Sequence, residues 1–362
     1  LVPLVWGWFW LFLAPSVVVP LNVVMNEHRL YLPGVAVALL AGAALARVHA
    51  HVTARGGVRR ARAALLLPFV CFGAAVVDRS LEWRDDLTLW TTAVERAPDS
   101  ARAHMHLGAA FHQRAQAAPI EESLPWLDAA LAEYAIAQRL HPGWYDLALN
   151  RGGAWLARGR ATGERADLER SLAAYEEAGR IVGPAKERPR YLQAVVHTEL
   201  GRFDPAHYER SLELMTRLDE EDDSVTTLYD DALARTYRAM GDRARAAAAM
   251  ERVIAIEEPQ GRIDGLLTLG WWHFEDGDLE SSQDVLTRAL EMARRAAETD
   301  IDDARRRRLF RAYLYVARFL NLVGQPDPSF AESARKLGWT APPAEIEWLR
   351  GGRTPGAPTR LR

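Results

Sequence analysis

The first 77 residues alternate between long apolar runs and short polar loops. Residues 1–26 contain no charged residue, and further uncharged runs cover residues 30–46 and 63–77. A helix needs about 20 apolar residues to cross the hydrocarbon core of a bilayer at 1.5 Å per residue. We therefore expect a membrane segment over residues 1–78, with transmembrane helices at 1–21, 30–48 and 63–77. A buried hairpin of a large soluble core is the alternative interpretation.

Beyond residue 79 the pattern changes to a repeat. A small residue, a large residue three positions on and a glycine seven positions on recur five times. Spacing of three puts the small and large residues on one helix face, and the glycine permits the left-handed turn that ends a helix. The five sets are Gly152, Trp155 and Gly159; Ala194, His197 and Gly201; Ala234, Tyr237 and Gly241; Gly270, His273 and Gly277; Ala317, Leu320 and Gly324.

A second helix is predicted in most of these units, with a small–large–small face. The sets are Ala130, Tyr134 and Ala137; Ser171, Tyr175 and Ala178; Ala246, Met250 and Val253; Ser282, Leu286 and Ala289. The third unit departs from this pattern in its second helix, with Ser211, Met215 and Leu218. Each hairpin of two such helices must bury its face against the next. The pattern predicts an all-α fold, with an α-solenoid of five to six hairpins over residues 79–340 and a disordered tail over residues 341–362.

These residues resemble the tetratricopeptide repeat. Leu107-Gly108 with Phe111, and Leu269-Gly270 with Gly277, follow its pattern most closely. The resemblance covers roughly residues 80–340, in which a 34-residue helix–turn–helix unit repeats. It implies a superhelix that binds protein or peptide partners.

The arginines predict how the chain is oriented. The loop between the second and third apolar runs contains no acidic residue but five arginines, Arg47, Arg55, Arg59, Arg60 and Arg62. The positive-inside rule places this loop in the cytoplasm, so the repeats lie on the other side. Lysine occurs only at Lys186 and Lys336, which suggests a GC-rich bacterial genome. We expect an integral protein of a bacterial inner membrane with extracytoplasmic repeats.

Two further segments resemble the transmembrane-and-tetratricopeptide-repeat family. They are the loop Met25-Asn26-Glu27-His28-Arg29-Leu30-Tyr31-Leu32-Pro33 and the junction Trp83-Arg84-Asp85-Asp86. That family is similar to GT-C glycosyltransferases, which use polyprenyl-phosphate sugars, and its enzymes are thought to transfer mannose to proteins. The resemblance implies that this chain is the C-terminal part of such a protein. The essential acidic loop is expected upstream of Leu1, so we expect no activity from this chain alone. A non-enzymatic membrane-tethered scaffold is the alternative.

Two candidate sites follow. In the first loop, Arg29 could contact the phosphate of a lipid-linked donor, with Glu27 or His28 beside it, since arginine suits phosphate recognition. The alternative is an interfacial charge pair that anchors the hairpin.

The second candidate site is a peptide groove lined by the first helix of each hairpin. We take the positions three before, one after and four after the small residue as pointing inward. The candidates are Tyr191, Asp231, Arg235, Arg238, Leu267, Trp271 and Phe274. Arginines would bind carboxylates and aromatics would supply contact area. An ordinary solvated face, with Trp271 packed between repeats, is the alternative.

No metal, cofactor or nucleic acid is expected as a ligand. His104 and His106 are two residues apart and cannot share a helix face, and zinc needs three or four convergent ligands. No nucleotide-binding loop, nucleophile elbow or zinc-protease motif occurs in the sequence. The expected partners are a protein or peptide and membrane lipid, including a polyprenyl-phosphate sugar.

Overall fold

The computed structural model describes residues 3, 7–9, 31–54, 70–78, 80–181, 187–221, 226–256, 259–299 and 302–337. Within these ranges every regular element is a helix, so the all-α prediction is confirmed there. The predicted donor loop at Glu27, His28 and Arg29 lies outside the described residues. The tail at 341–362 and most of the apolar run 1–21 also lie outside them.

The chain divides into two compact units, residues Leu1–Asp85 and Asp86–Arg362. The first unit contains α2 (Tyr31–Ala54), which begins within the predicted second span, and a helical stretch over residues 70–78. Among the described residues, no helix combines the length and the apolar character needed to cross a membrane. The three transmembrane spans therefore stay a prediction.

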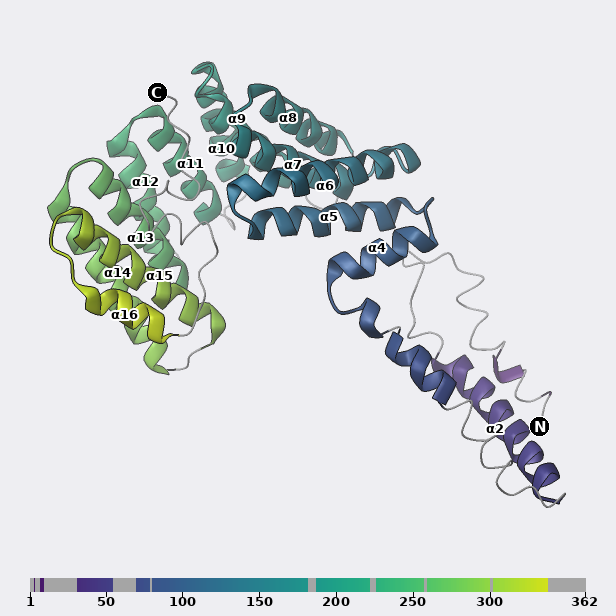
Figure 1. The fold of residues 1–362 in the computed structure, drawn as a ribbon. Helices are drawn as coiled ribbons and strands as arrows, with labels where there is room; N and C mark the ends of the chain where they lie inside the picture. The colour runs from purple at the N-terminus through teal and green to yellow at the C-terminus, as the bar shows by residue number, and fades with distance from the viewer. Residues whose placement is uncertain are drawn as a thin grey trace. The chain divides into compact units, whose positions relative to one another are not determined.

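The second unit is a succession of helices in which each packs on the next (Figure 1). The most extensive contacts join α5 to α6, α7 to α8, α9 to α10, α11 to α12 and α13 to α14, so these pairs form hairpins. The helices are α4 (Asp86–Arg96), α5 (Ala101–Ala117), α6 (Ile120–Leu140), α7 (Tyr145–Thr162), α8 (Arg165–Arg180), α9 (Glu187–Leu200), α10 (Ala206–Glu221), α11 (Thr226–Met240), α12 (Arg243–Ile256), α13 (Pro259–Glu275), α14 (Leu279–Thr299), α15 (Asp303–Leu322) and α16 (Pro328–Lys336).

The predicted faces of the second helices form the core of the hairpins. All twelve residues of the four small–large–small sets are at most 4% exposed, and so are Ser211, Met215 and Leu218 of the third unit. The small members allow close approach; Ser171 on α8, for example, donates a hydrogen bond to the carbonyl oxygen of Gly152 on α7 at 2.8 Å. Burial of the large members supplies most of the stabilisation, about 25 cal/mol per Å² of apolar area. The hairpin prediction is confirmed by these contacts.

The five glycines of the first helices separate into two groups. Gly241, Gly277 and Gly324 have φ of 84°, 84° and 77°, the left-handed turn that was predicted. The same prediction is wrong for Gly159 and Gly201, whose φ is not positive. A Cβ at Gly159 would lie 2.7 Å from Leu168, and one at Gly201 would lie 2.2 Å from Tyr208. These two glycines permit close packing of the next helix, and α7 continues until Gly163, which makes the left-handed turn.

Ion pairs join the first helices of neighbouring hairpins. Arg160 on α7 pairs with Glu199 on α9 at 2.8 Å, and Arg311 on α15 pairs with Asp264 on α13 at 2.8 Å. Such partly exposed pairs contribute about 0–1 kcal/mol each, so they add little to the stability of the stacked first helices.

Candidate functional site

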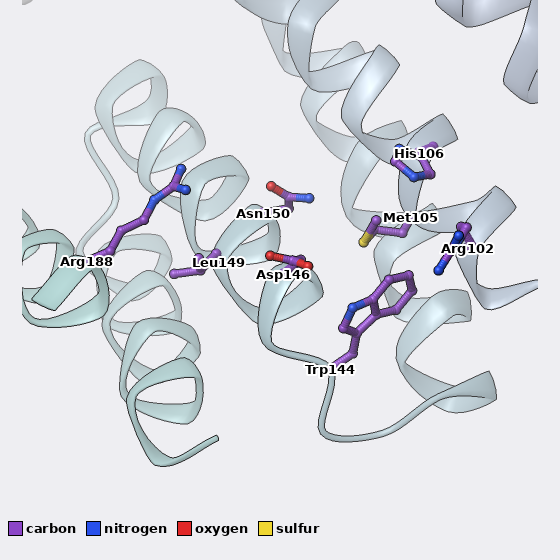
Figure 2. A pocket seen from close by; sticks show the side chains of 8 residues that line it. All are labelled: Arg102, Met105, His106, Trp144, Asp146, Leu149, Asn150 and Arg188. Carbon is purple, nitrogen blue, oxygen red and sulfur yellow. The ribbon is translucent and has the colours of Figure 1, made fainter. Parts of the chain in front are cut away.

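The first helices of successive hairpins form a common face. Helix α5 contacts α7, α7 contacts α9 and α9 contacts α11, so side chains from these helices can meet a single ligand. A cavity of about 340 Å³ opens on this face across α5, α7 and the start of α9 (Figure 2). Its lining residues are Arg102, Met105, His106, Trp144, Asp146, Leu149, Asn150 and Arg188.

The cavity has an apolar floor and an aromatic side. Met105 on α5 and Leu149 on α7 are buried, and the half-buried Trp144 lies on the turn that leads into α7. The ring of His106 stacks on Trp90 of α4, with centroids 4.2 Å apart and planes inclined by 15°. Charged and polar side chains make up more of the lining than apolar ones, unlike the mostly apolar pockets that bind small molecules, and the volume is at the small end of the range of such pockets.

His106 is held in its neutral form. Burial lowers its pKa below the usual 6.5, and the nearby positive charge of Arg102 lowers it further. The carboxylates of Asp86 and Asp146 act in the opposite direction but do not reverse the shift. At pH 7 the imidazole therefore offers one donor and one acceptor without a charge.

The polar groups of the cavity face solvent. Asp146 and Arg188 are exposed and Asn150 is half-buried. Within the described part of the chain, none of these three side chains takes part in a hydrogen bond or ion pair. Figure 2 shows Asp146 and Asn150 between Arg102 on one side and Arg188 on the other. A ligand can bind Asp146, Asn150 and Arg188 without first breaking a hydrogen bond or an ion pair inside the described part of the protein.

Two residues of the predicted groove are in the core instead. Leu267 is 1% exposed, so its prediction as an exposed groove residue is wrong. Trp271 is 6% exposed, with its ring 4.9 Å from that of Phe274 and 5.9 Å from that of Tyr315. Its indole N–H donates to Glu275, so the alternative in which Trp271 packs between repeats is correct. The aromatic surface expected there belongs to the contact between α13 and α15.

Two further groove candidates are also engaged within the protein. Arg238 donates to both carboxylate oxygens of Asp276, at 2.8 and 2.6 Å, and to Glu275 at 3.0 Å. Phe274 is half-buried, and its ring meets Phe319 edge-on at 5.9 Å. Both therefore join neighbouring hairpins, because the bulky position near the end of a first helix lies against the next repeat.

The remaining three candidates do lie near one another. Arg235 is exposed and donates to Asp231 one turn earlier on α11, at 2.8 Å. The pKa of Arg235 is raised overall. Desolvation alone would lower this pKa, but the interactions with Asp231, Tyr191 and Tyr315 have the larger, opposite effect. Tyr191 comes from α9 and Tyr315 from α15, so this arginine is accessible yet flanked by side chains of two other hairpins. Whether these residues bind a peptide stays a prediction.

The sequence missed the cavity because the groove candidates were taken from α9, α11 and α13, whereas the cavity lies over α5, α7 and the start of α9. The charged residues of the cavity stand six positions before the small residue of each unit, not three before it. The third position before the small residue, as at Met105 and Leu149, forms the floor. A count of charged residues at the sixth position could have found the site.

His104, one of the histidines of α5, is engaged within the protein. No group of three His, Cys, Asp or Glu side chains that could hold a metal ion occurs in the part of the chain that the structure describes. His104 is buried and its ring nitrogens lie 2.6 Å from Glu133 and 2.8 Å from the carbonyl oxygen of Pro98. It therefore joins α5 to α6 and to the preceding turn.

No protein-family model matches the chain, and no curated protein matches it. Among solved structures it is similar to a tetratricopeptide repeat protein from Parabacteroides merdae, with 14% identity, 84% of this chain and 96% of that chain covered and a TM-score of 0.46. The APC/C hetero-tetramer Cut9–Hcn1 is similar at 12% identity over 70% of this chain, which spans 46% of that one, with a TM-score of 0.43. The human IFIT1 dimer with PPP-AAAA is similar at 12% identity over 90% of this chain and 76% of that one, with a TM-score of 0.45. The assignment of helical hairpins rests on the helix contacts themselves.

Proposed function

We propose that the second unit is a protein-binding module that holds a peptide segment of a partner along the face of α5, α7 and α9. The observation that carries this proposal is the cavity on that face. Three of its polar side chains, Asp146, Asn150 and Arg188, line it without a hydrogen bond or an ion pair to the described residues. A peptide offers the matching groups, because its backbone pairs with an amide such as Asn150 and its charged side chains with Asp146 and Arg188.

Filling the cavity tests the proposal. Peptides are first selected from a random library on the full chain, and their affinities are then measured by fluorescence anisotropy. In the Asn150→Trp variant the indole occupies the cavity, so we expect affinity to fall by about tenfold or more, as at a central interface position. Ala173→Trp, at an exposed position of α8, is the matched control and should bind normally. Equal binding by both variants would contradict the proposal.

The same proposal includes a membrane tether in the first unit. Its support is the uncharged run of residues 1–26 and the exposure of apolar side chains in the described helix over residues 70–78, where Val70 is 66% and Phe72 is 72% exposed. Exposed apolar groups of this kind favour a lipid or protein contact. A tethered chain should stay with membranes during alkaline extraction, with its repeats open to protease from the outer side only. Release of the chain from membranes by alkali would contradict the proposed membrane tether.

Sugar transfer from a polyprenyl-phosphate donor to the bound partner is the finer form of this function. It rests on the resemblance of the Glu27–Arg29 loop to the transmembrane-and-tetratricopeptide-repeat family. In that form the repeats present the acceptor protein, and Arg29 contacts the donor phosphate. Sugar transfer would be supported if the protein modifies its bound partner and the Arg29→Ala variant loses this modification. Binding of the partner without modification would favour the non-enzymatic scaffold.

A further inference from the structure

The charges of the cavity follow a fixed order across three hairpins. Arg102 on α5, Asp146 on α7 and Arg188 on α9 each stand six residues before the small residue of their helix, Gly108, Gly152 and Ala194. They occupy equivalent places in successive repeats, so the order along the face is positive, negative, positive. The next two equivalent positions are Leu228 and Asp264, and Asp264 is already paired with Arg308 and Arg311. The pattern is therefore confined to the cavity.

The spacing of the helices selects a peptide conformation. Packed helices lie about 8–10 Å apart, so the three charges are separated by roughly that distance from one hairpin to the next. A polyproline-II segment rises about 3.1 Å per residue with three residues per turn, so every third side chain recurs on one face after about 9 Å. A β-strand has a similar rise but alternates its side chains with a period of two, so its third residue points to the opposite face. The polyproline-II segment is the one that presents a side chain to each hairpin.

The aromatic side of the cavity suits the same ligand. Trp144 lines the cavity, and the ring of Trp90 stacks on that of His106, another lining residue. Aromatic-lined grooves bind proline-rich segments in this conformation, because the ligand is already ordered before it binds. Single-stranded nucleic acid fits less well, since Asp146 stands at the centre of the face and the chain has a formal charge of −3 and a pI of about 6.4.

We propose that this face reads a polyproline-II segment with an acidic, a basic and an acidic side chain at three-residue intervals. The acidic side chains meet Arg102 and Arg188, and the basic one meets Asp146. This inference rests on the proposed function and deepens it by naming the ligand. Asn150 and the neutral His106, one turn after Asp146 and Arg102, supply hydrogen bonds to the peptide backbone.

Synthetic peptides test the charge register. A proline-rich peptide with Glu, Lys and Glu at positions 1, 4 and 7 is compared with one of identical composition that carries them at positions 1, 2 and 7. Affinities for the full chain are measured by fluorescence anisotropy at low and high salt. Exposed ion pairs contribute a few-fold each, so we expect about tenfold tighter binding of the first peptide, and a smaller difference at high salt.

A charge exchange separates recognition from folding. Asp146→Lys should weaken the Glu-Lys-Glu peptide and strengthen a Glu-Glu-Glu peptide of the same spacing, a gain that an unfolded variant cannot show. Asp146→Asn should reduce the preference between the two peptides without reversing it. Equal binding of the register peptides, or no reversal in Asp146→Lys, would overturn the inference.

The experiments distinguish protein binding at the cavity from recognition of the charge register. If library-selected peptides still depend on Asn150 but show no charge register, the inference fails and the protein-binding function stands. If no selected peptide depends on the cavity, both fail. A tight complex with single-stranded RNA that Asn150→Trp abolishes would assign the face to nucleic acid and would also overturn the inference.

Discussion

At the scale of the residue, packing distance decides what a glycine does in this fold. Gly152 and Gly153 are neighbours in the middle of α7, yet their surroundings differ. A Cβ at Gly152 would lie 2.5 Å from the ring of the buried Tyr175, whereas one at Gly153 would lie 3.3 Å from the half-buried His112. The first contact requires a core ring to move, and the second requires a small shift of a partly exposed one.

We expect opposite effects from alanine at these two positions. Gly152→Ala should lower the free energy of unfolding by about 1–3 kcal/mol from overpacking, reduced by up to about 1 kcal/mol of helix propensity. Gly153→Ala should be neutral or raise it by up to about 1 kcal/mol. Urea denaturation followed by circular dichroism measures both. Equal losses in the two variants would mean that α7 and α8 are not packed as described.

At the scale of the element, a histidine pair joins the end of α9 to the start of α10. The Nδ1 atoms of His197 and His207 lie 2.7 Å apart, which requires at least one neutral ring. Burial lowers the pKa of His197 from 6.5 to about 4, helped by His207 and by Arg210. The folded protein thus binds this proton less readily than the unfolded chain does.

The sign of the pH dependence follows from that shift. The stabilisation is complete above pH 6.5 and is lost as the pH falls from 6.5 to about 4, because the unfolded chain takes up the proton first. We expect a drop in melting temperature between pH 7 and pH 5 that becomes smaller in His197→Gln. Differential scanning calorimetry at both pH values measures it. An unchanged drop in the variant would assign the pH dependence to other groups.

At the scale of the second unit, the core is a chain of local clusters. One cluster joins α7, α8 and α9 around Leu168, and another joins α11 to α15 around Leu286. The extensive helix contacts join neighbouring repeats, so stability is close to a sum of local terms. Damage to one cluster should therefore loosen nearby hairpins more than distant ones.

Hydrogen exchange can resolve this locality. Leu168 is 0% and Leu286 is 1% exposed, so alanine at either site should cost about 2–5 kcal/mol. We expect Leu286→Ala to reduce amide protection mainly in α13–α15, and Leu168→Ala to reduce it mainly in α7–α9. Each variant serves as the control for the other. A uniform loss along α5–α15 in both would indicate a single cooperative unit instead.

The sequence by itself determined the helices and the faces that they bury. The small–large–small sets of α6, α8, α12 and α14 are buried as predicted, because a period of 3.6 residues and a small–large alternation leave a helix few ways to pack. The same reasoning located Gly241 and Gly277 at left-handed turns. Both features depend on residues close together in the chain.

Only the tertiary structure decided which side chains remain open to a ligand. The stacking of α5, α7 and α9 brings the cavity residues Arg102, Asp146 and Arg188 together, although they are 44 and 42 residues apart in the sequence. The packing of α13 on α14 and α15 buries Leu267 and Trp271. The periodicity of the sequence identifies the residues that each helix buries. The rotation of each hairpin relative to the next determines which of the other residues on that helix face solvent. That rotation depends on contacts such as Arg160 with Glu199, which no local pattern contains.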